Sequence, residues 1–497
     1  MRKFDTIVIG SGISGLTISL ILARCGQKVL LLEKAPALGG SVARFRRAGM
    51  PFDIGFHFTG GFEEGGIMRD AFTRLGLMDR IEPLFLHGEG ASRMIFEREG
   101  GDFTLPLGYR QMTERVLGYF PKEERGVREY FRKVKDVCNN TPSMDLGKMD
   151  FTMPRLEEDF ISLEEGLRSL TGDHVLRGLL ETYAMCYGVR PSEISFANHA
   201  RMVMNFYESL AYVRGGGDAI VEAFTSEFER LGVEVMTKET VADFHEPGDG
   251  GAIREFSLLG GETVKADNCV FTIHPLEVLS MLPQDRLKKA FVNRVQSYEP
   301  SVGFFGLFAL EKEEGPREEG PTIVSVFPHA EVDRLLDPKE GGWPGIVVIS
   351  SVEEAVKGRR PVHILEPVFP SEASRWAGSS LGNRPVDYEE YKQRHEREII
   401  DAVGRGLPGL REKMEVVCSA STLTFRDYLN SPDGSAYGVK QKIGQFNLVG
   451  RLPLRNLFAA GQSAVLPGLM GAMMSAFIVG SMVVGMDKYG EFIRGEA

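Results

Sequence analysis

Apolar and polar positions in the first forty residues are arranged as expected for a strand, a turn, a helix and a second strand. Residues 4–9 form an apolar, β-branched run, and residues 16–24 place apolar side chains at helical spacing. Gly26 ends this predicted helix, and residues 29–32 form a second apolar run typical of a buried parallel strand. The chain is therefore predicted to begin with a compact βαβ unit.

The pattern between about residues 107 and 210 is mainly helical. Ser162 and Glu165 have the spacing of a capping box, and Pro191 lies in a break between two later helical runs. A triple glycine then precedes another helix. The predicted helices after the capping box cover residues 175–187, 196–210 and 218–231.

Short β-type runs follow, separated by loops rich in Gly, Pro and Glu, and they predict a sheet-based substrate domain. The last eighty residues return to dinucleotide-type sequence. The predicted strands cover residues 233–236, 262–272, 302–310, 322–327 and 345–350. We therefore expect a discontinuous nucleotide domain of residues 1–106, 205–273 and 418–497. A substrate domain with a helical cap is expected from residues 107–204 and 274–417.

One segment near the C-terminus is apolar enough that a transmembrane helix has to be considered. Residues 456–486 contain no charged side chain, and residues 469–486 alone reach the length of a transmembrane helix. Pro467 and several glycines interrupt the segment, however. A buried helix inside a large α/β core is the favoured interpretation.

Composition and charge exclude several function classes. The chain has 497 residues, 43% of them hydrophobic, and a net charge of −11, which argues against nucleic acid as a partner. Its five cysteines are scattered without a CxxC pair, so neither a disulfide framework nor a metal site is predicted. These features, and an N-terminal apolar stretch without a cleavage site, favour a cytoplasmic protein.

The turn of the predicted βαβ unit contains a glycine-rich motif. Residues 10–15 read GSGISG, a GxGxxG motif placed between a strand and a helix. Its glycines permit a tight turn, close approach of a pyrophosphate, and helix–strand packing, while the helix N-terminus faces the phosphates. Glu33 closes the second strand, where a carboxylate can accept hydrogen bonds from ribose hydroxyls. The motif therefore predicts a dinucleotide site.

Two further features favour FAD over NAD. Gly39 and Gly40 form a second glycine turn, which a simple NAD domain does not need. Residues 456–472 predict a strand, a glycine turn and a helix whose N-terminus can face a flavin ring. The expected fold is α/β: a discontinuous Rossmann-like FAD domain of amine-oxidase-like architecture with an inserted α+β substrate domain. The expected cofactor-binding residues are Gly10, Gly12, Ile13, Ser14, Gly15, Glu33, Lys34, Gly39, Gly40, Ser41, Val241, Gly461, Gln462, Gly468, Leu469, Met470 and Gly471.

Both ends of the chain resemble the phytoene desaturase superfamily of flavoproteins, and more closely its branch of carotenoid isomerases and retinol saturases. The segments that carry this resemblance are residues 53–58 (DIGFHF), 190–200, 216–217, 429–438 and 461–472. The chain departs from the family pattern in two places. Many relatives have a basic or bulky residue soon after the second glycine pair, whereas here residues 41–43 come first and the first basic residue is Arg44. Ser463 stands where aspartate is common. The resemblance implies FAD, a hydrophobic tunnel and chemistry at carbon–carbon double bonds. It does not choose between saturation, desaturation and cis–trans isomerisation.

Few titratable residues are needed, because a flavin itself accepts or donates the hydride. If a double bond is saturated, one acid must add a proton to the carbon opposite the hydride. His57 is the first candidate, in a loop that the resemblance places near the flavin, although a structural histidine is the alternative. His199, on an apolar helix stripe, and Tyr437, in a late loop, are weaker candidates.

Two alternative functions are a flavin amine oxidase and a non-enzymatic prenyl-lipid binding protein. Amine oxidation favours an aromatic cage, and neither Trp343 nor Trp376 lies in a flavin-type motif. A prenyl-lipid binder needs no flavin, which the intact glycine motif argues against. The expected partners are an apolar small molecule and an external electron donor or acceptor. An apolar substrate is also compatible with contact at a membrane surface.

Overall fold

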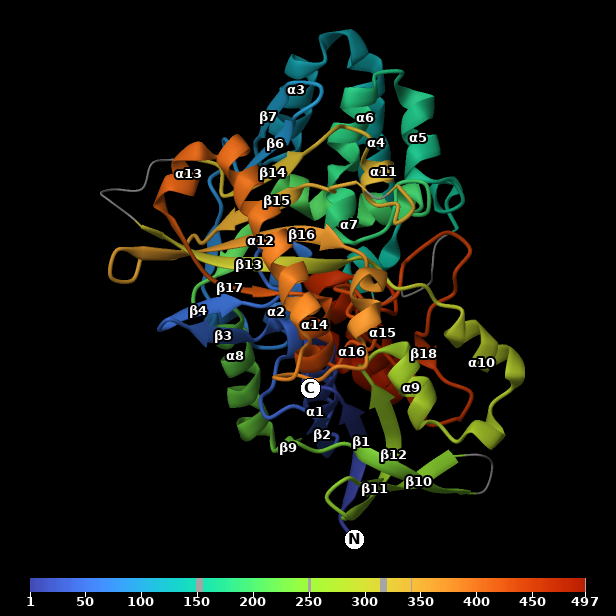
Figure 1. Ribbon diagram of the computed structural model, residues 1–497. Helices are drawn as coiled ribbons and strands as arrows, with labels where there is room; N and C mark the ends of the chain where they lie inside the picture. Colours follow the sequence, from blue (N-terminus) through green and yellow to red (C-terminus); the bar gives the residue numbers. More distant parts are fainter. Residues whose placement is uncertain (149–154, 249–251, 313–319, 341, 497) are drawn as a thin grey trace.

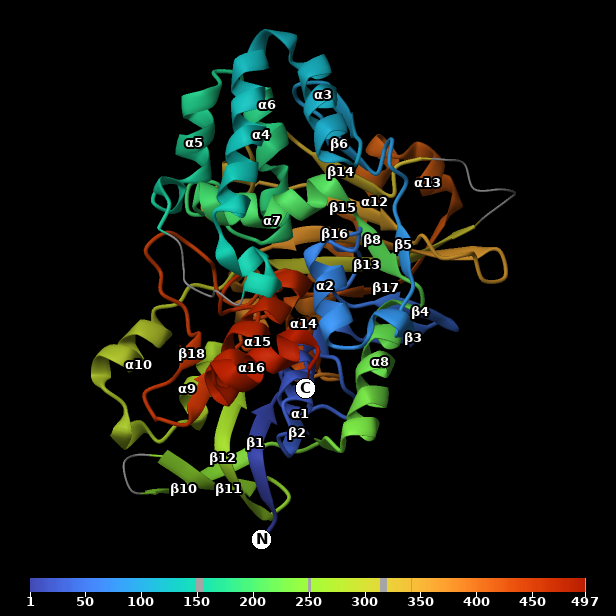
Figure 2. The ribbon, with the colours of Figure 1, turned by 180° about the vertical axis from the view of Figure 1, so that it is seen from behind.

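The computed structural model describes residues 1–148, 155–248, 252–312, 320–340 and 342–496. Two large sheets and a layer of helices follow one another along the molecule (Figures 1 and 2). In Figure 1 the first sheet is at the bottom, the second crosses the middle, and the helical layer is at the top. The N-terminus lies at the end of the first sheet.

The first sheet is built around the start of the chain. Its central strand β1 pairs in parallel with β2 and β12, and β9 and β19 extend the parallel part on either side. This pairing confirms the predicted βαβ unit. The strands are β1 (Lys3–Ile9), β2 (Val29–Glu33), β9 (Glu234–Thr237), β10 (Val241–Gly248), β11 (Ala252–Leu258), β12 (Thr263–Phe271), β18 (Gly450–Arg451) and β19 (Leu457–Ala459).

Helix α1 (Ile13–Arg24) packs against α8 (Gly216–Leu231) and α15 (Gly468–Val484). It begins three residues before the predicted start, because Gly12 occupies the N-cap position. The Ser14 hydroxyl donates to the Ala472 carbonyl at 2.8 Å and ties the first helix to the last part of the chain. Helix α15 is largely buried. Among the described residues, we find no helix with the length and apolarity needed to cross a membrane.

The second sheet has seven strands in the order β17-β13-β16-β15-β14-β6-β7, and its neighbours are antiparallel except for β14 and β6. The strands β6 and β7 belong to this sheet, although their residues were assigned to the nucleotide domain. Their pairing with β14 joins residues more than 200 positions apart, which local patterns do not reveal. The strands are β6 (Ser92–Phe96), β7 (Gly101–Leu105), β13 (Gly303–Lys312), β14 (Ile323–Phe327), β15 (Ile346–Ser350), β16 (Arg359–Val368) and β17 (Met414–Ala420).

The helical layer contains the predicted capping box. The Ser162 hydroxyl accepts from the Glu165 backbone N–H at 3.1 Å, and the Glu165 carboxylate accepts from the Ser162 N–H at 3.0 Å. The helix predicted over 175–187 is shorter, because its last turns have 3-10 geometry. The helices of this layer are α3 (Tyr109–Tyr119), α4 (Glu124–Asn139), α5 (Leu163–Leu170), α6 (His174–Glu181) and α7 (Phe196–Glu208).

The remaining elements surround the two sheets. The hairpin of β3 (Arg44–Arg47) and β4 (Met50–Asp53) brings the segment after the second glycine turn against β16. A short pair joins β5 (Pro83–Phe85) to β8 (Ala211–Val213). The other helices are α2 (Ile67–Arg74), α9 (Pro275–Met281), α10 (Lys289–Gln296), α11 (Val332–Leu335), α12 (Val386–Gly406), α13 (Pro408–Lys413), α14 (Thr422–Leu429) and α16 (Met486–Arg494).

Candidate functional site

A cavity of about 360 Å³ opens at the carboxyl ends of the parallel strands β1, β2 and β12. Ligands of open α/β sheets bind at this edge. The expected cofactor residues that line it are Gly10, Gly12, Ile13, Ser14, Glu33, Lys34, Gly40, Ser41, Val241, Gly461 and Gln462. We refer to this space as the nucleotide cavity.

The three glycines of the first loop have different surroundings. Gly10 has a φ of +98°, which favours glycine, and a Cβ on Gly15 would lie 1.8 Å from the Gly10 carbonyl oxygen. A Cβ on Gly12 would meet no protein atom within 4 Å, and the backbone there has ordinary angles. Gly10 and Gly15 are thus required by the fold, whereas Gly12 leaves a cradle open towards the cavity.

The second glycine turn lies directly against the first. The Gly39 N–H donates to the Ser11 carbonyl at 3.1 Å, and a Cβ on Gly40 would lie 3.4 Å from the Gly12 Cα. The backbone at Gly39 has a φ of +108°. The two turns therefore form one wall at the N-terminus of α1.

Glu33 is held in a fixed position at the end of β2. Its carboxylate accepts from the Ser11 N–H at 2.8 Å, from the Ser11 hydroxyl at 2.6 Å and from the Ala35 N–H at 2.7 Å. Each carboxylate oxygen can accept more than one hydrogen bond, so these contacts leave capacity for a ribose hydroxyl.

These residues fit FAD. Helix α1 has no side-chain cap, so its first N–H groups point to the Gly12 cradle, as a pyrophosphate requires. Glu33 offers the acceptor for the ribose. Gly461 and Gln462 also form part of the cavity wall. When bound, FAD supplies a flavin that accepts or donates hydride.

The other expected cofactor residues fall into two groups. Gly468, Leu469 and Met470 line a second cavity, described below. Gly15, Gly39 and Gly471 line neither cavity, since the space beside each is occupied by protein atoms. A Cβ on Gly471 would lie 2.1 Å from the Leu466 carbonyl oxygen. These three glycines permit close packing.

The second cavity measures about 200 Å³ and is mostly apolar. We call it the apolar cavity. No Asp, Glu, Lys or Arg is among the described residues that line it. It shares wall residues with the nucleotide cavity, so groups bound in the two cavities can touch. The shared residues are Ile13, Ser41, Leu429, Ala436, Gln462 and Ala472.

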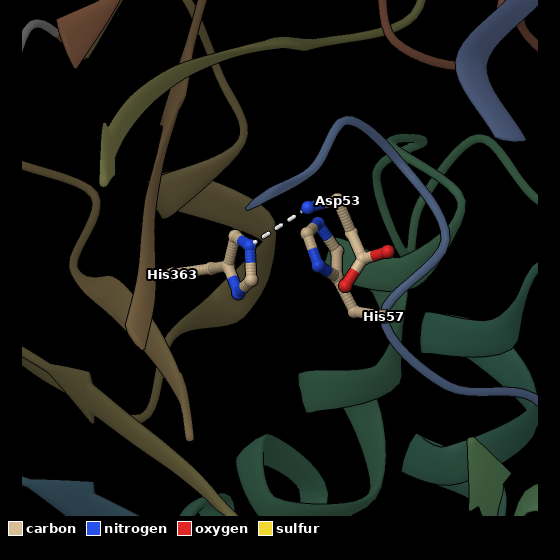
Figure 3. A group of neighbouring side chains, drawn as sticks. All are labelled: Asp53, His57 and His363. Carbon is tan, nitrogen blue, oxygen red and sulfur yellow. Dashed lines mark hydrogen bonds between the residues drawn. The ribbon is translucent and has the colours of Figure 1, made fainter. Parts of the chain in front are cut away.

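His57 lies in the wall of the apolar cavity, and its ring centre is 4.8 Å from that of His363 on β16. Figure 3 shows these two rings beside Asp53, the last residue of β4. The Asp53 backbone N–H donates to Nε2 of His363 at 3.1 Å. Burial lowers the pKa of His57 to about 4 and holds that of His363 well below its usual value. Both imidazoles are therefore neutral near pH 7.

Asp53 is the charged centre behind His57. Its carboxylate lies 3.2 Å from the Arg44 guanidinium and accepts from the Tyr212 hydroxyl at 2.7 Å. Arg44 also donates to Glu353 at 2.7 Å. Burial raises the pKa of Asp53 to about 6, and Arg44 opposes this shift. Arg44, the first basic residue after the second glycine turn, thus anchors the hairpin and balances the negative charge of the two carboxylates.

The structure separates the other two catalytic candidates. Tyr437 lines the apolar cavity, and burial raises the pKa of its hydroxyl, so it stays protonated. His199 lines neither cavity. Its Nε2 is 2.7 Å from the Tyr130 hydroxyl and its Nδ1 is 2.8 Å from the Tyr187 hydroxyl. Both nitrogens are thus occupied within the helical layer, and the structure does not bring His199 to either cavity.

Several residues at the site were not found from the sequence. Asp53 was quoted only for the family resemblance, and Arg44 only as a departure from it. His363 lies 310 positions from Asp53, on a strand without a motif, so no local signal could identify it. Thr272, whose hydroxyl donates to the Ile9 and Gly10 carbonyls at 3.0 Å, was likewise overlooked.

The sheet, the glycine turns and the two adjoining cavities define an FAD-dependent oxidoreductase. A family model described as "Flavin containing amine oxidoreductase" matches residues 13–306, and the chain belongs to this family. Within it, the chain is a phytoene desaturase-type enzyme near the carotenoid isomerase and retinol saturase branch.

Two relatives illustrate this placement. The chain is 26% identical to human all-trans-retinol 13,14-reductase, over 99% of this chain and 87% of the relative. It is 24% identical to the chloroplastic prolycopene isomerase of Daucus carota, over 88% of this chain and 72% of the relative.

Solved structures share the architecture. An oxidoreductase from Methanosarcina mazei has a TM-score of 0.68 at 15% identity, covering 96% of this chain and 99% of its own. Putrescine oxidase bound to putrescine has a TM-score of 0.67 at 14% identity, covering 98% and 99%. At these identities the likeness concerns the fold alone.

Proposed function

We propose that this protein is an FAD-dependent oxidoreductase that acts on carbon–carbon double bonds of an apolar polyene. The observation that carries the proposal is the apolar cavity, which adjoins the nucleotide cavity and has no charged side chain among its described lining residues. A polyene offers neither a charge nor an acidic proton. Its recognition therefore depends on shape and on exclusion of water.

Of the three reactions at a double bond, we propose saturation. The matched relative named as a reductase aligns with nearly the whole chain, whereas the isomerase covers less of it. Saturation also gives a role to His57, which lies in the wall of the cavity and carries a transferable proton. Isomerisation or desaturation would appear in the test below as a different product.

Different residues of the chain bind the nucleotide, line the substrate site and donate the proton. Glu33 and the first turn of α1 hold the nucleotide. Leu469 and Met470, at the start of α15, form part of the wall that faces the substrate. His57 donates a proton to the carbon that does not receive the hydride, and Tyr437 contributes a polar edge to the same wall. Flexible Met side chains suit a long, irregular hydrocarbon.

Electrons are proposed to come from an external donor. No second nucleotide fingerprint occurs in the sequence, so a second dinucleotide domain is not expected. Contact with a membrane surface is likewise part of the proposal, because apolar polyenes partition into lipid.

Amine oxidation is less well supported. Its substrate is an amine that is usually protonated in water, and the apolar cavity offers no carboxylate among its described lining residues. Trp343 and Trp376 do not line that cavity. Trp376 instead packs against Tyr388 and Tyr391.

Product analysis under anaerobic conditions tests the proposal. Dithionite-reduced protein is mixed with a panel of retinoids and carotenoids, and oxidised protein is mixed with the same panel and with polyamines. We expect a retinoid or carotenoid product with one double bond fewer. An isomer of unchanged mass would assign isomerisation instead. Bleaching of oxidised flavin by polyamines, with no change in any polyene, would contradict the proposal.

A further inference from the structure

A small third cavity lies behind His57, on the side of Asp53. Its volume is about 10 Å³, and its polar lining comes from Asp53, His57, Tyr212, Thr322, Ser350, Ser351 and His363. A single water needs about 10–15 Å³ of such space and two to four polar partners. The cavity therefore has the size and the lining of a site for one water.

One buried polar atom of its lining residues needs a partner. Nδ1 of His57 has no hydrogen-bond partner among the described residues, whereas Oδ1 of Asp53 makes no hydrogen bond but lies 3.2 Å from Nε of Arg44. Buried polar atoms are nearly always satisfied by protein or by ordered water. Ligand-type atoms of Asp53, His57 and His363 lie within 4.8 Å of one another. One water can bridge such a gap, since two hydrogen bonds of about 2.8 Å span it.

A metal ion is a poorer occupant of this cluster. The Asp53 carboxylate is already balanced by Arg44 at 3.2 Å, and Nε2 of His363 accepts the Asp53 N–H. A metal would have to compete with a fixed cation and displace that hydrogen bond. Water needs neither change.

We propose that Asp53, through one water in this cavity, supplies the proton that His57 delivers to the substrate. The inference rests on the proposed saturation. A hydride from the reduced flavin and a proton add to the two carbons of one double bond. His57 gives the proton from one ring nitrogen and regains one at the other from the water, which is replenished by the Asp53 carboxyl. Proton exchange with solvent between turnovers restores the starting tautomer of His57. Asp53 recovers its proton from solvent at the partly exposed Ser350–Ser351 end. One solvent proton is consumed for each double bond.

The groups that face Asp53 set the pH range of this route. They are Arg44, Tyr212, Glu353, His57 and His363, of which both histidines are neutral near pH 7. Because the pKa of Asp53 is raised to about 6, it holds its proton below that pH and loses it above. Saturation should therefore slow as pH rises through about 6.

Two variants test the route by reoxidation of the reduced flavin with a polyene between pH 5 and 9. In Asp53→Asn no carboxyl proton is available, so we expect reoxidation to slow at least about tenfold at pH 6. The decrease of the rate with rising pH, which we call the pH limb, should disappear. The flavin spectrum should be unchanged. Tyr212→Phe removes a hydrogen bond that lowers the Asp53 pKa. We expect its limb to move to higher pH, a change that a purely structural role would not produce.

The outcomes separate this route from the function on which it rests. Asp53→Asn with the wild-type rate and limb, or Tyr212→Phe with an unmoved limb, would overturn the route alone. If Asp53→Asn fails to fold because Arg44 loses one of its two carboxylate partners, the pH dependence of Tyr212→Phe decides. A wild-type protein that binds FAD but is not reoxidised by any polyene would overturn both the route and the proposed function.

Discussion

The nucleotide cavity and the apolar cavity share a wall but are built in different ways. The first includes the backbone of two glycine turns, with Glu33 as its fixed carboxylate. The second is formed by side chains from α7, β13, β15, β16, α14 and α15. A backbone-built site depends on a few short motifs, whereas a side-chain-built site depends on how distant elements pack. The predictions below test this difference, from the largest expected effect to the smallest.

Gly12→Ala should strongly weaken FAD binding without unfolding the protein. The backbone there suits alanine and the new Cβ would meet no protein atom, so it fills only the cradle meant for the pyrophosphate. We expect FAD affinity to fall by about a hundredfold, which is about 2.7 kcal/mol. Isothermal titration of FAD into the apoprotein measures this, and circular dichroism checks the fold.

Gly118→Ala is the matched control, since Gly118 is exposed on α3 and a Cβ there also meets no protein atom. It should bind FAD like the wild type. Wild-type affinity in Gly12→Ala would show that the cradle does not hold the cofactor, and the two cavities would lose their assigned roles.

The nucleotide cavity was easier to predict from the sequence than the apolar cavity, because several of its residues lie in one short segment of the chain. Gly10, Gly12 and Glu33 lie in one βαβ unit, where spacing alone determines their arrangement. His363 and Asp53 meet only because the β3–β4 hairpin packs against β16. The sequence could not place His199 away from the cavities, because an apolar helix stripe looks the same whether it packs in a core or lines a cavity. The strands β6 and β7 were expected in the nucleotide domain because β14, with which β6 pairs, is remote in the sequence.

Val347→Phe should reduce polyene turnover while leaving FAD bound. Val347 lies on β15 and lines the apolar cavity only, so the larger ring takes substrate space. We expect kcat/KM for a polyene to fall about tenfold, which is about 1.4 kcal/mol, with unchanged flavin content. Val347→Ala, which enlarges the same cavity, should instead tolerate bulkier substrates. Wild-type turnover of the polyene in both variants would show that the apolar cavity is not the substrate site.

The smallest expected effect concerns a buried carboxyl at the end of α6 in the helical layer. Burial, with Asp333 and Glu164 nearby, raises the pKa of Glu181 to about 8. The folded state therefore favours the neutral form. The resulting stability is complete below the ordinary pKa of about 4.5 and is lost as pH rises through about 8.

Melting temperatures of the wild type and Glu181→Gln at pH 5, 7 and 9 measure this loss. The difference should shift in favour of Glu181→Gln as pH increases, because the amide never ionises. A difference that stays constant across the range would mean that Glu181 is more hydrated than its burial indicates.

The central claim is that a flavin in one cavity meets an apolar double bond in the other. Anaerobic mixing of the reduced protein with all-trans-retinol, one equivalent per flavin, tests it most directly. We predict that the absorbance of oxidised flavin returns in a single turnover and that one double bond is saturated for each flavin reoxidised. Flavin that stays reduced with this and every other polyene of the panel, while oxidised protein accepts electrons from an amine, would contradict the claim.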